Sequence, residues 1–235
     1  MKVRGMKMLE VIGMSVEDCI EIEKAGADRI ELVAALSEGG LTPSKGMIEQ
    51  CFEAVSIPIR VMIRPHSRNF YYSAYDLEVM KADIEDVKQI GCEGIVIGAL
   101  DENGHIHQKM LEELLKVSGE LNVTFHRAFD ELADLEKGLD ILLQYPNIKT
   151  ILTSGGSAGK IEEHVAILRK LVQKANQRME ILLGGGVHAE NIHQLIRETG
   201  SNSVHIGSMA RENKRLDAEI SIANIQNIVN GMYTI

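Results

Sequence analysis

The sequence contains only three cysteines, Cys19, Cys51 and Cys92, an odd number spread far apart along the chain. They form neither a C-x-x-C motif nor a Cys/His spacing typical of a metal site, and nothing suggests a disulfide framework. Cys19 and Cys51 fall in helical patterns, and Cys92 shortly precedes a strand. We therefore expect small, buried and unreactive thiols rather than metal ligands.

The chain also lacks a long apolar run and an excess of positive charge. The basic segment at residues 1–7 is followed by an apolar run that Glu10 interrupts, too early for a signal-peptide core or a membrane span. The 25 basic residues are scattered among 34 acidic ones, and the formal net charge is −9. We therefore expect a cytoplasmic protein that binds neither nucleic acid nor membrane.

No low-complexity linker interrupts the 235 residues, and this length leaves no room for a second full domain. Hydrophobic residues make up 45% of the chain, which is ample for one core. The sequence therefore predicts a single domain over residues 1–235.

Short β-rich apolar runs alternate with longer amphipathic stretches along the chain. The predicted strands are 8–13, 29–33, 59–63, 94–98, 123–126, 150–153, 180–183 and 203–206. The predicted helices are 15–25, 44–55, 75–90, 108–118, 135–144, 161–175, 188–198 and 217–230. Unbroken alternation requires a parallel sheet, and eight units close into a ring, so we predict an α/β fold of the TIM-type (β/α)8 barrel. A doubly wound open sheet is the alternative.

Polar residues stand at or just after the ends of several predicted strands, the working face of such barrels. Glu10, Glu31 and His205 interrupt apolar strands, and Arg64 follows another. Because the first three strands are neighbours, Glu10, Glu31 and Arg64 are predicted to form one cluster. The cluster is either a structural ion-pair network or a site in which one glutamate acts as a general acid or base.

His126, Arg127 and Asp130 follow the fifth predicted strand. A short helical turn would bring the imidazole of His126 to the carboxylate of Asp130 as a proton-transferring pair. The alternative is that Asp130 caps the loop and His126 fills a polar hole. The position at a strand end favours the functional interpretation.

Glycines and serines follow the last three predicted strands and indicate an anion site. They are Ser154, Gly155 and Gly156 after the sixth strand, Gly184, Gly185 and Gly186 after the seventh, and Ser208 after the eighth. In many barrels, backbone N–H groups of these loops bind phosphate. A tight turn also needs glycine, but three in succession exceed that need. We therefore expect a small anionic ligand here.

His105 and His107 lie two residues apart after the fourth predicted strand. One metal ion could bridge them, but no third ligand is nearby in the sequence, which favours a solvated loop. The eleven methionines are spaced singly, as core residues are, rather than grouped as Cu(I) ligands. Residue patterns alone therefore assign no metal ligand.

Several long motifs in a fixed order give the chain a family resemblance from about residue 8 to residue 209. They are Leu-Glu-Val near the start, Ala-Gly-Ala-Asp-Arg-Ile-Glu-Leu at 25–32, Leu-Ser-Glu-Gly-Gly-Leu-Thr-Pro-Ser at 36–44, Val-Met-Ile-Arg-Pro at 61–65, Thr-Phe-His-Arg-Ala-Phe-Asp at 124–130, Leu-Thr-Ser-Gly-Gly at 152–156 and Gly-Gly-Gly-Val at 184–187. Together they resemble the CutC family. The resemblance implies a cytoplasmic TIM-type barrel, assembly into a homo-oligomer such as a dimer or tetramer, and a link to copper homeostasis, with copper as the implied cofactor.

Copper is also where the chain departs from the family pattern. Many relatives carry cysteines after the Leu-Glu-Val and Ile-Glu-Leu motifs, where this chain has Ile12 and Val33, which cannot ligate a metal. Two functions therefore stay open. One is copper handling; the other is an isomerase, epimerase, lyase or hydrolase acting on a small anionic or phosphorylated metabolite at the barrel mouth. No lysine ends a predicted strand, which argues against a Schiff-base aldolase.

Overall fold

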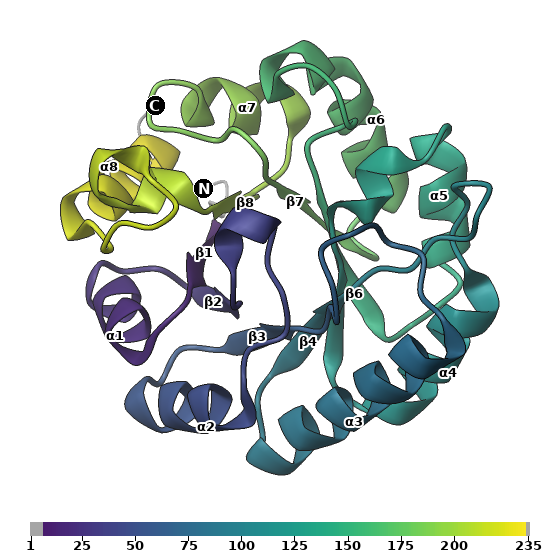
Figure 1. Ribbon diagram of the computed structural model, residues 1–235. Coiled ribbons are helices and arrows are strands. Elements are labelled where there is room, and N and C mark those ends of the chain that lie inside the picture. Colours follow the sequence, from purple (N-terminus) through teal and green to yellow (C-terminus); the bar gives the residue numbers. More distant parts are fainter. Residues whose placement is uncertain (1–6, 234–235) are drawn as a thin grey trace.

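The computed structural model describes residues 7–233 and contains a closed barrel of eight parallel strands (Figure 1). The strands are β1 (Met8–Gly13), β2 (Arg29–Leu32), β3 (Ile59–Met62), β4 (Gly94–Ile97), β5 (Asn122–Phe125), β6 (Ile148–Thr153), β7 (Glu180–Leu183) and β8 (Ser203–Ile206). β1 pairs with both β2 and β8, so the sheet has no free edge. The predicted (β/α)8 barrel is confirmed, and the open sheet is excluded.

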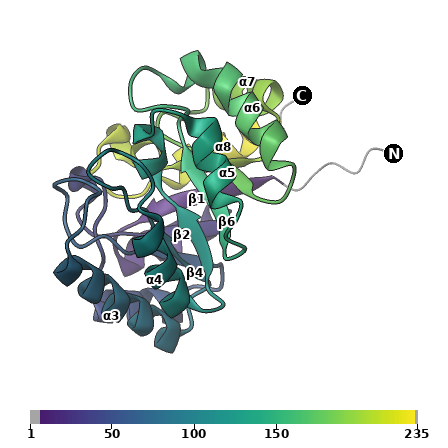
Figure 2. The ribbon, with the colours of Figure 1, turned by 90° about the vertical axis from the view of Figure 1, so that its right-hand side faces the viewer.

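Helices follow the strands and form a ring outside the barrel (Figures 1 and 2). The α-helices are α1 (Val16–Lys24), α2 (Lys45–Ala54), α3 (Ala74–Ile90), α4 (Gln108–Ser118), α5 (Leu135–Leu142), α6 (Val165–Ala175), α7 (Ile192–Thr199) and α8 (Ile222–Tyr233). Short 3-10 helices are η1 (Leu36–Glu38), η2 (Arg127–Glu131), η3 (Ile161–His164), η4 (Ser208–Ala210) and η5 (Glu212–Lys214). This arrangement gathers the carboxyl ends of the strands, with their following loops, on one face.

Serine caps determine where three of the helices begin. The side chains of Ser15, Ser44 and Ser73 each accept a hydrogen bond from the backbone N–H three residues later. The side chain of Asp76 accepts a hydrogen bond from the Ser73 N–H in return, which completes a capping box. Gly91 ends α3 with φ at +93°, a left-handed conformation that suits glycine. Local sequence therefore places these boundaries.

Longer contacts move other boundaries away from the predicted positions. α7 begins four residues later than predicted, because the Asn191 side chain accepts a hydrogen bond from the His188 N–H and holds a turn there. α8 begins five residues later, because an antiparallel bridge joins Arg211 to Ile220. β6 begins two residues earlier than predicted, at Ile148.

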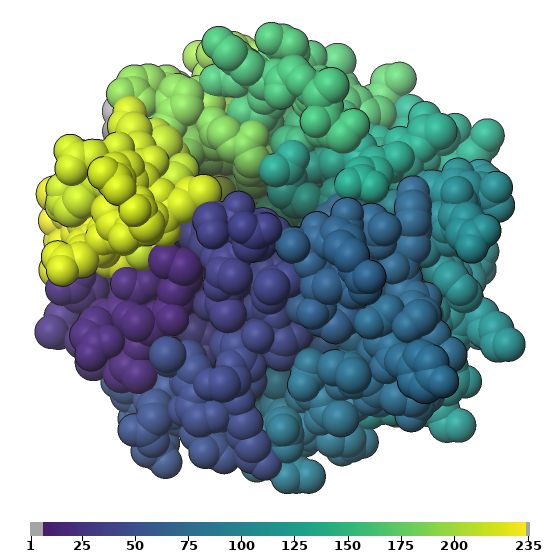
Figure 3. Space-filling model, viewed as in Figure 1, coloured from purple at the N-terminus to yellow at the C-terminus, as the bar shows by residue number. Residues whose placement is uncertain are grey.

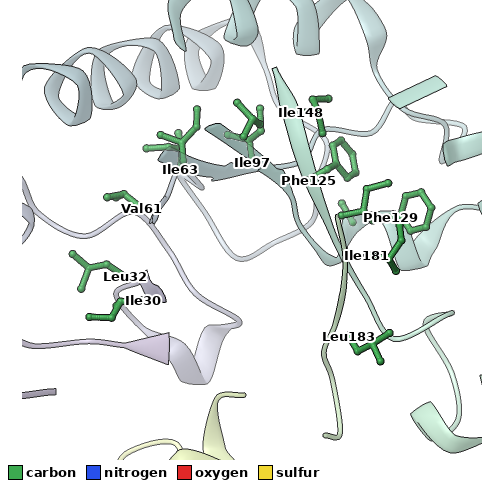
Figure 4. Close-up of a cluster of buried hydrophobic side chains, with 14 of the residues drawn as sticks. Ile30, Leu32, Val61, Ile63, Ile97, Phe125, Phe129, Ile148, Ile181 and Leu183 are labelled. Atoms are coloured by element: carbon green, nitrogen blue, oxygen red, sulfur yellow. The ribbon is translucent and has the colours of Figure 1, made fainter. Parts of the chain in front are cut away.

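Side chains alternate between the two faces of each strand, and the main hydrophobic core lies between the strands and the helices. Ile30, Leu32 and Val61 belong to this large apolar cluster (Figure 4). Arg29 and Glu31 alternate with them along β2 and are also buried. Because they occupy the opposite face of the strand, the barrel interior carries charged groups.

Candidate functional site

A cavity of about 350 Å³ opens at the carboxyl ends of the strands, which we call the mouth cavity. Its polar lining consists of Glu31, Arg64, His126, Arg127, Gly185, Gly186, His188, His205, Gly207 and Ser208. Its apolar lining includes Ile12, Leu36, Met62, Phe70, Leu152, Val187 and Met209. In Figure 3 the surface is hollowed near its centre, where dark blue, green and yellow segments meet. Apolar walls with a few polar groups are typical of small-molecule sites.

Below the mouth cavity, an ion-pair network fills the barrel. Arg29 donates to Glu10 and, at 3.1 Å, to Glu180. Arg60 donates to Glu93 at 2.8 Å and to the hydroxyl groups of two threonines, each at 2.7 Å. These threonines are Thr124 and Thr150. Such pairing is what allows charged groups to be buried in a barrel.

Glu10 and His205 connect this network to the mouth cavity. His205 Nδ1 lies 2.8 Å from Glu10 Oε1, and its Nε2 lies 3.8 Å from Glu31 Oε2. Burial opposes the charge of Glu10, but Arg29 and His205 outweigh it and lower the pKa of Glu10 to about 2. Burial also opposes the charge of His205, but Glu31 and Glu10 outweigh it and raise the pKa of His205. Glu10 is therefore an ionised partner below the site.

Glu31 differs from Glu10 although both are fully enclosed. Burial, with repulsion from Glu10, raises the pKa of Glu31 to about 7 despite the attraction of His205. Its Oε1 atom is buried and has no hydrogen-bond partner among the described residues. Glu31 is therefore a carboxyl group that can hold or release a proton near neutral pH.

Arg64 does not pair with Glu10 and Glu31. The prediction that these three residues form one cluster is therefore wrong for Arg64. Arg64 follows the end of β3, and its guanidinium donates to backbone carbonyls in two loops at 3.1 to 3.2 Å. The carbonyls belong to Glu38, Gly40 and Ser67. Arg29 takes the expected place because β1 and β2 pair in a register that sets it opposite Glu10.

His126 and Asp130 do not form the predicted pair. His126 Nδ1 accepts a hydrogen bond from the Ala128 N–H at 3.1 Å, which caps η2. Asp130 accepts from Arg127 Nε at 2.9 Å and from the Ser154 N–H at 3.0 Å. The 3-10 turn over residues 127–131 therefore directs the carboxylate toward β6 rather than toward the imidazole.

Asp130 instead positions Arg127 at the mouth cavity. The Arg127 Nη2 atom also donates to the Ser154 hydroxyl at 3.0 Å, and Thr153 donates its hydroxyl proton to Asp130. A Cβ atom built on Gly185 would lie 2.9 Å from Arg127 Cζ, so the guanidinium lies directly against the glycine backbone. A partly exposed cation thus meets a glycine loop, an arrangement suited to an anion.

The predicted anion-binding residues divide into two groups. Gly185, Gly186 and Ser208 line the mouth cavity, and Gly185 and Gly186 have φ of +80° and +119°. Gly184 packs on Leu152 next to the cavity instead. The structure does not bring Gly155 and Gly156 into the cavity, because their loop folds outward against His164. Ser154 acts below the surface by holding Asp130 and Arg127.

One group of three residues has the spacing of a shared cation. Ligand atoms of Glu10, Glu31 and His205 lie within 4.8 Å of one another. The Arg29 guanidinium already contacts Glu10, and the raised pKa of His205 favours its positive form. The cluster therefore supplies its own positive charge, and we assign no metal to it.

Other candidate ligands lie away from this cavity. The His105 side chain is exposed, and His107 caps α4 by accepting a hydrogen bond from the Met110 N–H at 3.2 Å. Cys19, Cys51 and Cys92 are free and buried, as predicted; that they are unreactive stays a prediction.

Sequence patterns did not reveal Arg29, Arg60 and Phe70. Arg29 stands two residues before Glu31 and shares its strand face, a spacing that could have identified it. Arg60 likewise stands two residues before Met62 on β3, so the two side chains share one face of that strand. Phe70 lies in a long loop between β3 and α3, and nothing in its surroundings distinguishes it from an ordinary apolar residue.

No helix in the described part of the chain is both long and apolar enough to cross a bilayer. The cytoplasmic location and the assembly into a dimer or tetramer stay predictions.

Comparison with known proteins gives the family. Residues 7–210 match the CutC family. The human copper homeostasis protein cutC homolog is 40% identical over 198 residues, which cover 84% of this chain and 72% of the relative. The mouse homolog is 39% identical over 198 residues, which again cover 84% of this chain and 72% of the relative.

Solved structures agree with this similarity. The copper homeostasis protein CutC of Streptococcus agalactiae has a TM-score of 0.80 and 36% identity, covering 85% of this chain and 98% of its own. Phosphoribosyl anthranilate isomerase from Thermococcus kodakaraensis has a TM-score of 0.65 at 16% identity, covering 97% and 99% of the two chains, and shows a shared fold alone. The family match over residues 7–210, the identities and the barrel agree, and the chain belongs to the CutC family.

Proposed function

We propose that this CutC-family barrel is an enzyme that transfers a proton on a small anionic metabolite bound in the mouth cavity. Glu31 carries the proposal. It is a buried carboxyl group that lines the cavity, has one oxygen without a hydrogen-bond partner in the described part of the chain, and has a pKa raised to about 7 by burial and by Glu10. A general acid or base works best when its pKa lies near the operating pH.

Arg127 and the Gly185–Gly186 backbone supply the anion site in this proposal. Arg127 Nη2 and Nε are held by Ser154 and Asp130, so the guanidinium keeps its orientation without a ligand. A held cation loses little side-chain entropy when an anion binds. Glycines with positive φ let an anionic group approach the backbone closely.

Copper is the metal named in the relatives, and the mouth cavity lacks the cysteine thiolates that soft Cu(I) selects. Cu(I) prefers thiolate and thioether ligands. The cavity lining contains the thioethers of Met62 and Met209 but no cysteine. Ile12 and Val33 belong to an apolar cluster beside Met62. The proposed proton transfer by Glu31 needs no copper ion.

Ligand binding by purified, metal-stripped protein tests this proposal. Thermal shift and calorimetry would compare glycerol 3-phosphate and inorganic phosphate with Cu(I) and Zn(II). A ligand at about 100 times its dissociation constant adds about 2.7 kcal/mol to the free energy of unfolding. We expect a shift with glycerol 3-phosphate that Arg127→Gln reduces by about tenfold or more in affinity.

Arg197→Gln is the matched control, because Arg197 is exposed on α7 and, among residues 7–233, forms its ion pair with its neighbour Glu198. It should bind as the parent does. Sub-micromolar Cu(I) binding with no response to either phosphate would contradict the proposal and favour copper handling.

A further inference from the structure

We infer that the ligand of the mouth cavity carries a carbonyl group, that Glu31 removes a proton from the carbon beside it, and that Arg64 and His126 donate hydrogen bonds to the carbonyl oxygen. This inference rests on the proposed function and adds the reaction class. A base and N–H donors that line one cavity are the parts that an isomerase passing through an enol requires.

The imidazole of His126 is fixed in one tautomer. Because Nδ1 accepts a hydrogen bond from the Ala128 N–H, the proton of the neutral ring is on Nε2. Burial and the nearby Arg64 cation lower the pKa of His126 to about 3, so the ring is neutral at physiological pH. Nε2 is buried and has no partner among residues 7–233. His126 is thus an unsatisfied neutral donor.

Arg64 supplies a second unsatisfied donor. Its Nη atoms are held by backbone carbonyls, and Nε is buried and forms no hydrogen bond within the described chain. The guanidinium also lies near the Tyr72 hydroxyl, whose pKa burial raises and Arg64 lowers to a smaller extent. The guanidinium centre lies 4.8 Å from the centroid of the Phe70 ring, and the His126 ring lies 4.8 Å from the same centroid. Phe70 therefore contacts both donor groups, which places them in one part of the cavity wall.

The base lies beside Arg64 in the barrel wall, because β2 pairs with β3. Glu31 lies on β2, Arg64 follows β3 and His126 follows β5, and all three line the mouth cavity. Arg127 and Gly185 line the same cavity. A cavity of about 350 Å³ lies at the lower end of the volumes found for ligand pockets, which suits a small metabolite. The geometry points to a small phosphorylated ketone or aldehyde.

The step balances without a co-reactant. The Glu31 carboxylate takes a proton from the carbon beside the carbonyl, and the C–H electron pair forms a C=C bond. The carbonyl π pair moves to oxygen, where the N–H groups of Arg64 and His126 stabilise the negative charge.

The protonated Glu31 then returns the proton to carbon. Return to the same carbon restores the ligand. If that carbon carries a hydroxyl group, return to the former carbonyl carbon moves the carbonyl, while the hydroxyl proton passes to the enolate oxygen.

Two probes with the same phosphate test this chemistry. Phosphoglycolohydroxamate is a planar mimic of the enolate, whereas glycerol 3-phosphate has no carbonyl. Calorimetry should give about 100-fold or tighter binding of the hydroxamate. His126→Asn keeps an acceptor near the Ala128 N–H but removes the outer donor, and should weaken the hydroxamate far more than glycerol 3-phosphate. His126→Gln places an amide N–H near the position of Nε2 and should restore part of the preference.

A proton spectrum of ¹⁵N-labelled protein adds a direct signal. The His126 Nε2–H resonance should shift when the hydroxamate binds. Equal binding of the two probes, or an equal loss of both in His126→Asn, would overturn the carbonyl inference while leaving the anion site in place. Failure of wild-type protein to bind either probe at millimolar concentration would overturn the proposed function as well.

Discussion

The lower barrel and the mouth cavity both bury charged side chains, but they differ in how those side chains are paired. In the lower barrel, Arg29 and Arg60 each donate to carboxylate or hydroxyl oxygens. At the mouth, Glu31 Oε1, Arg64 Nε and His126 Nε2 have no partner in the described chain. The first region is complete as it stands, and the second has unused hydrogen-bonding capacity.

This difference in pairing distinguishes buried charges that stabilise the fold from buried polar groups that are available to a ligand. An unsatisfied buried polar atom costs about 1–3 kcal/mol, so a folded protein carries few of them. Of the six such side-chain atoms found among residues 7–233, three belong to residues that line the mouth cavity. Two of these are donors and one is a carboxyl oxygen. A carbonyl ligand next to an acidic C–H would complement all three.

The largest effect is expected in the lower barrel. Arg29→Met would leave Glu10 and Glu180 without their shared cation, and removing one partner from a buried ion pair costs about 3–5 kcal/mol. Urea unfolding at pH 7 measures the loss. Arg197→Met on the surface of α7 is the control and should change the free energy of unfolding by less than about 0.5 kcal/mol. A loss below about 1 kcal/mol for Arg29→Met would mean that the network is solvated.

At the mouth, Glu31→Gln is expected to raise the free energy of unfolding at pH 8, whereas Arg29→Met lowers it in the lower barrel. The pKa of Glu31 rises from its ordinary value of 4.5 to about 7 in the folded state, so the native state holds a proton that the unfolded state releases. Glu31 therefore lowers stability as the pH rises from about 4.5 to about 7, by about 2–3 kcal/mol in total. Glu31→Gln should be more stable than the parent at pH 8 and equal to it at pH 4, as measured by urea unfolding. If Glu31→Gln is less stable than the parent at pH 8, the Glu31 carboxylate is stabilised by an ion pair, as the charged groups of the lower barrel are.

The barrel could be predicted from sequence because the alternation of short apolar strands with amphipathic helices is a local pattern, and so are the polar residues at the strand ends. Glu31, Arg127 and Gly185 were predicted at the mouth for the same reason, and they line its cavity. The partner of each charged group could not be predicted, because pairing depends on strand register and loop direction. Arg64 was expected to pair with glutamates, but its loop position turns it toward carbonyls, as the 3-10 turn after β5 turns Asp130 toward Arg127.

A smaller effect is expected from Asp130→Asn. This substitution tests whether the ion pair between Asp130 and Arg127 contributes to anion binding in the mouth cavity. The substitution removes the negative charge that holds Arg127, and the affinity for glycerol 3-phosphate should fall about tenfold. Asp134→Asn is the matched control: Asp134 caps α5 four residues further along, so it should leave affinity unchanged. Equal affinities of the parent and Asp130→Asn in calorimetry would mean that Arg127 needs no fixed orientation.

The smallest effect separates backbone strain from a direct contact. Gly185→Ala and Gly104→Ala both place a Cβ on a left-handed backbone, with φ of +80° and +74°, so each should lose about 1–2 kcal/mol of stability. Only the Gly185 Cβ meets a neighbour, Arg127 Cζ at 2.9 Å, whereas Gly104 has open space within 4 Å. Affinity for glycerol 3-phosphate should therefore fall a few-fold in Gly185→Ala alone. If both variants bind as the parent does, Arg127 moves aside freely, and the anion site depends on the glycine backbone rather than on a fixed guanidinium.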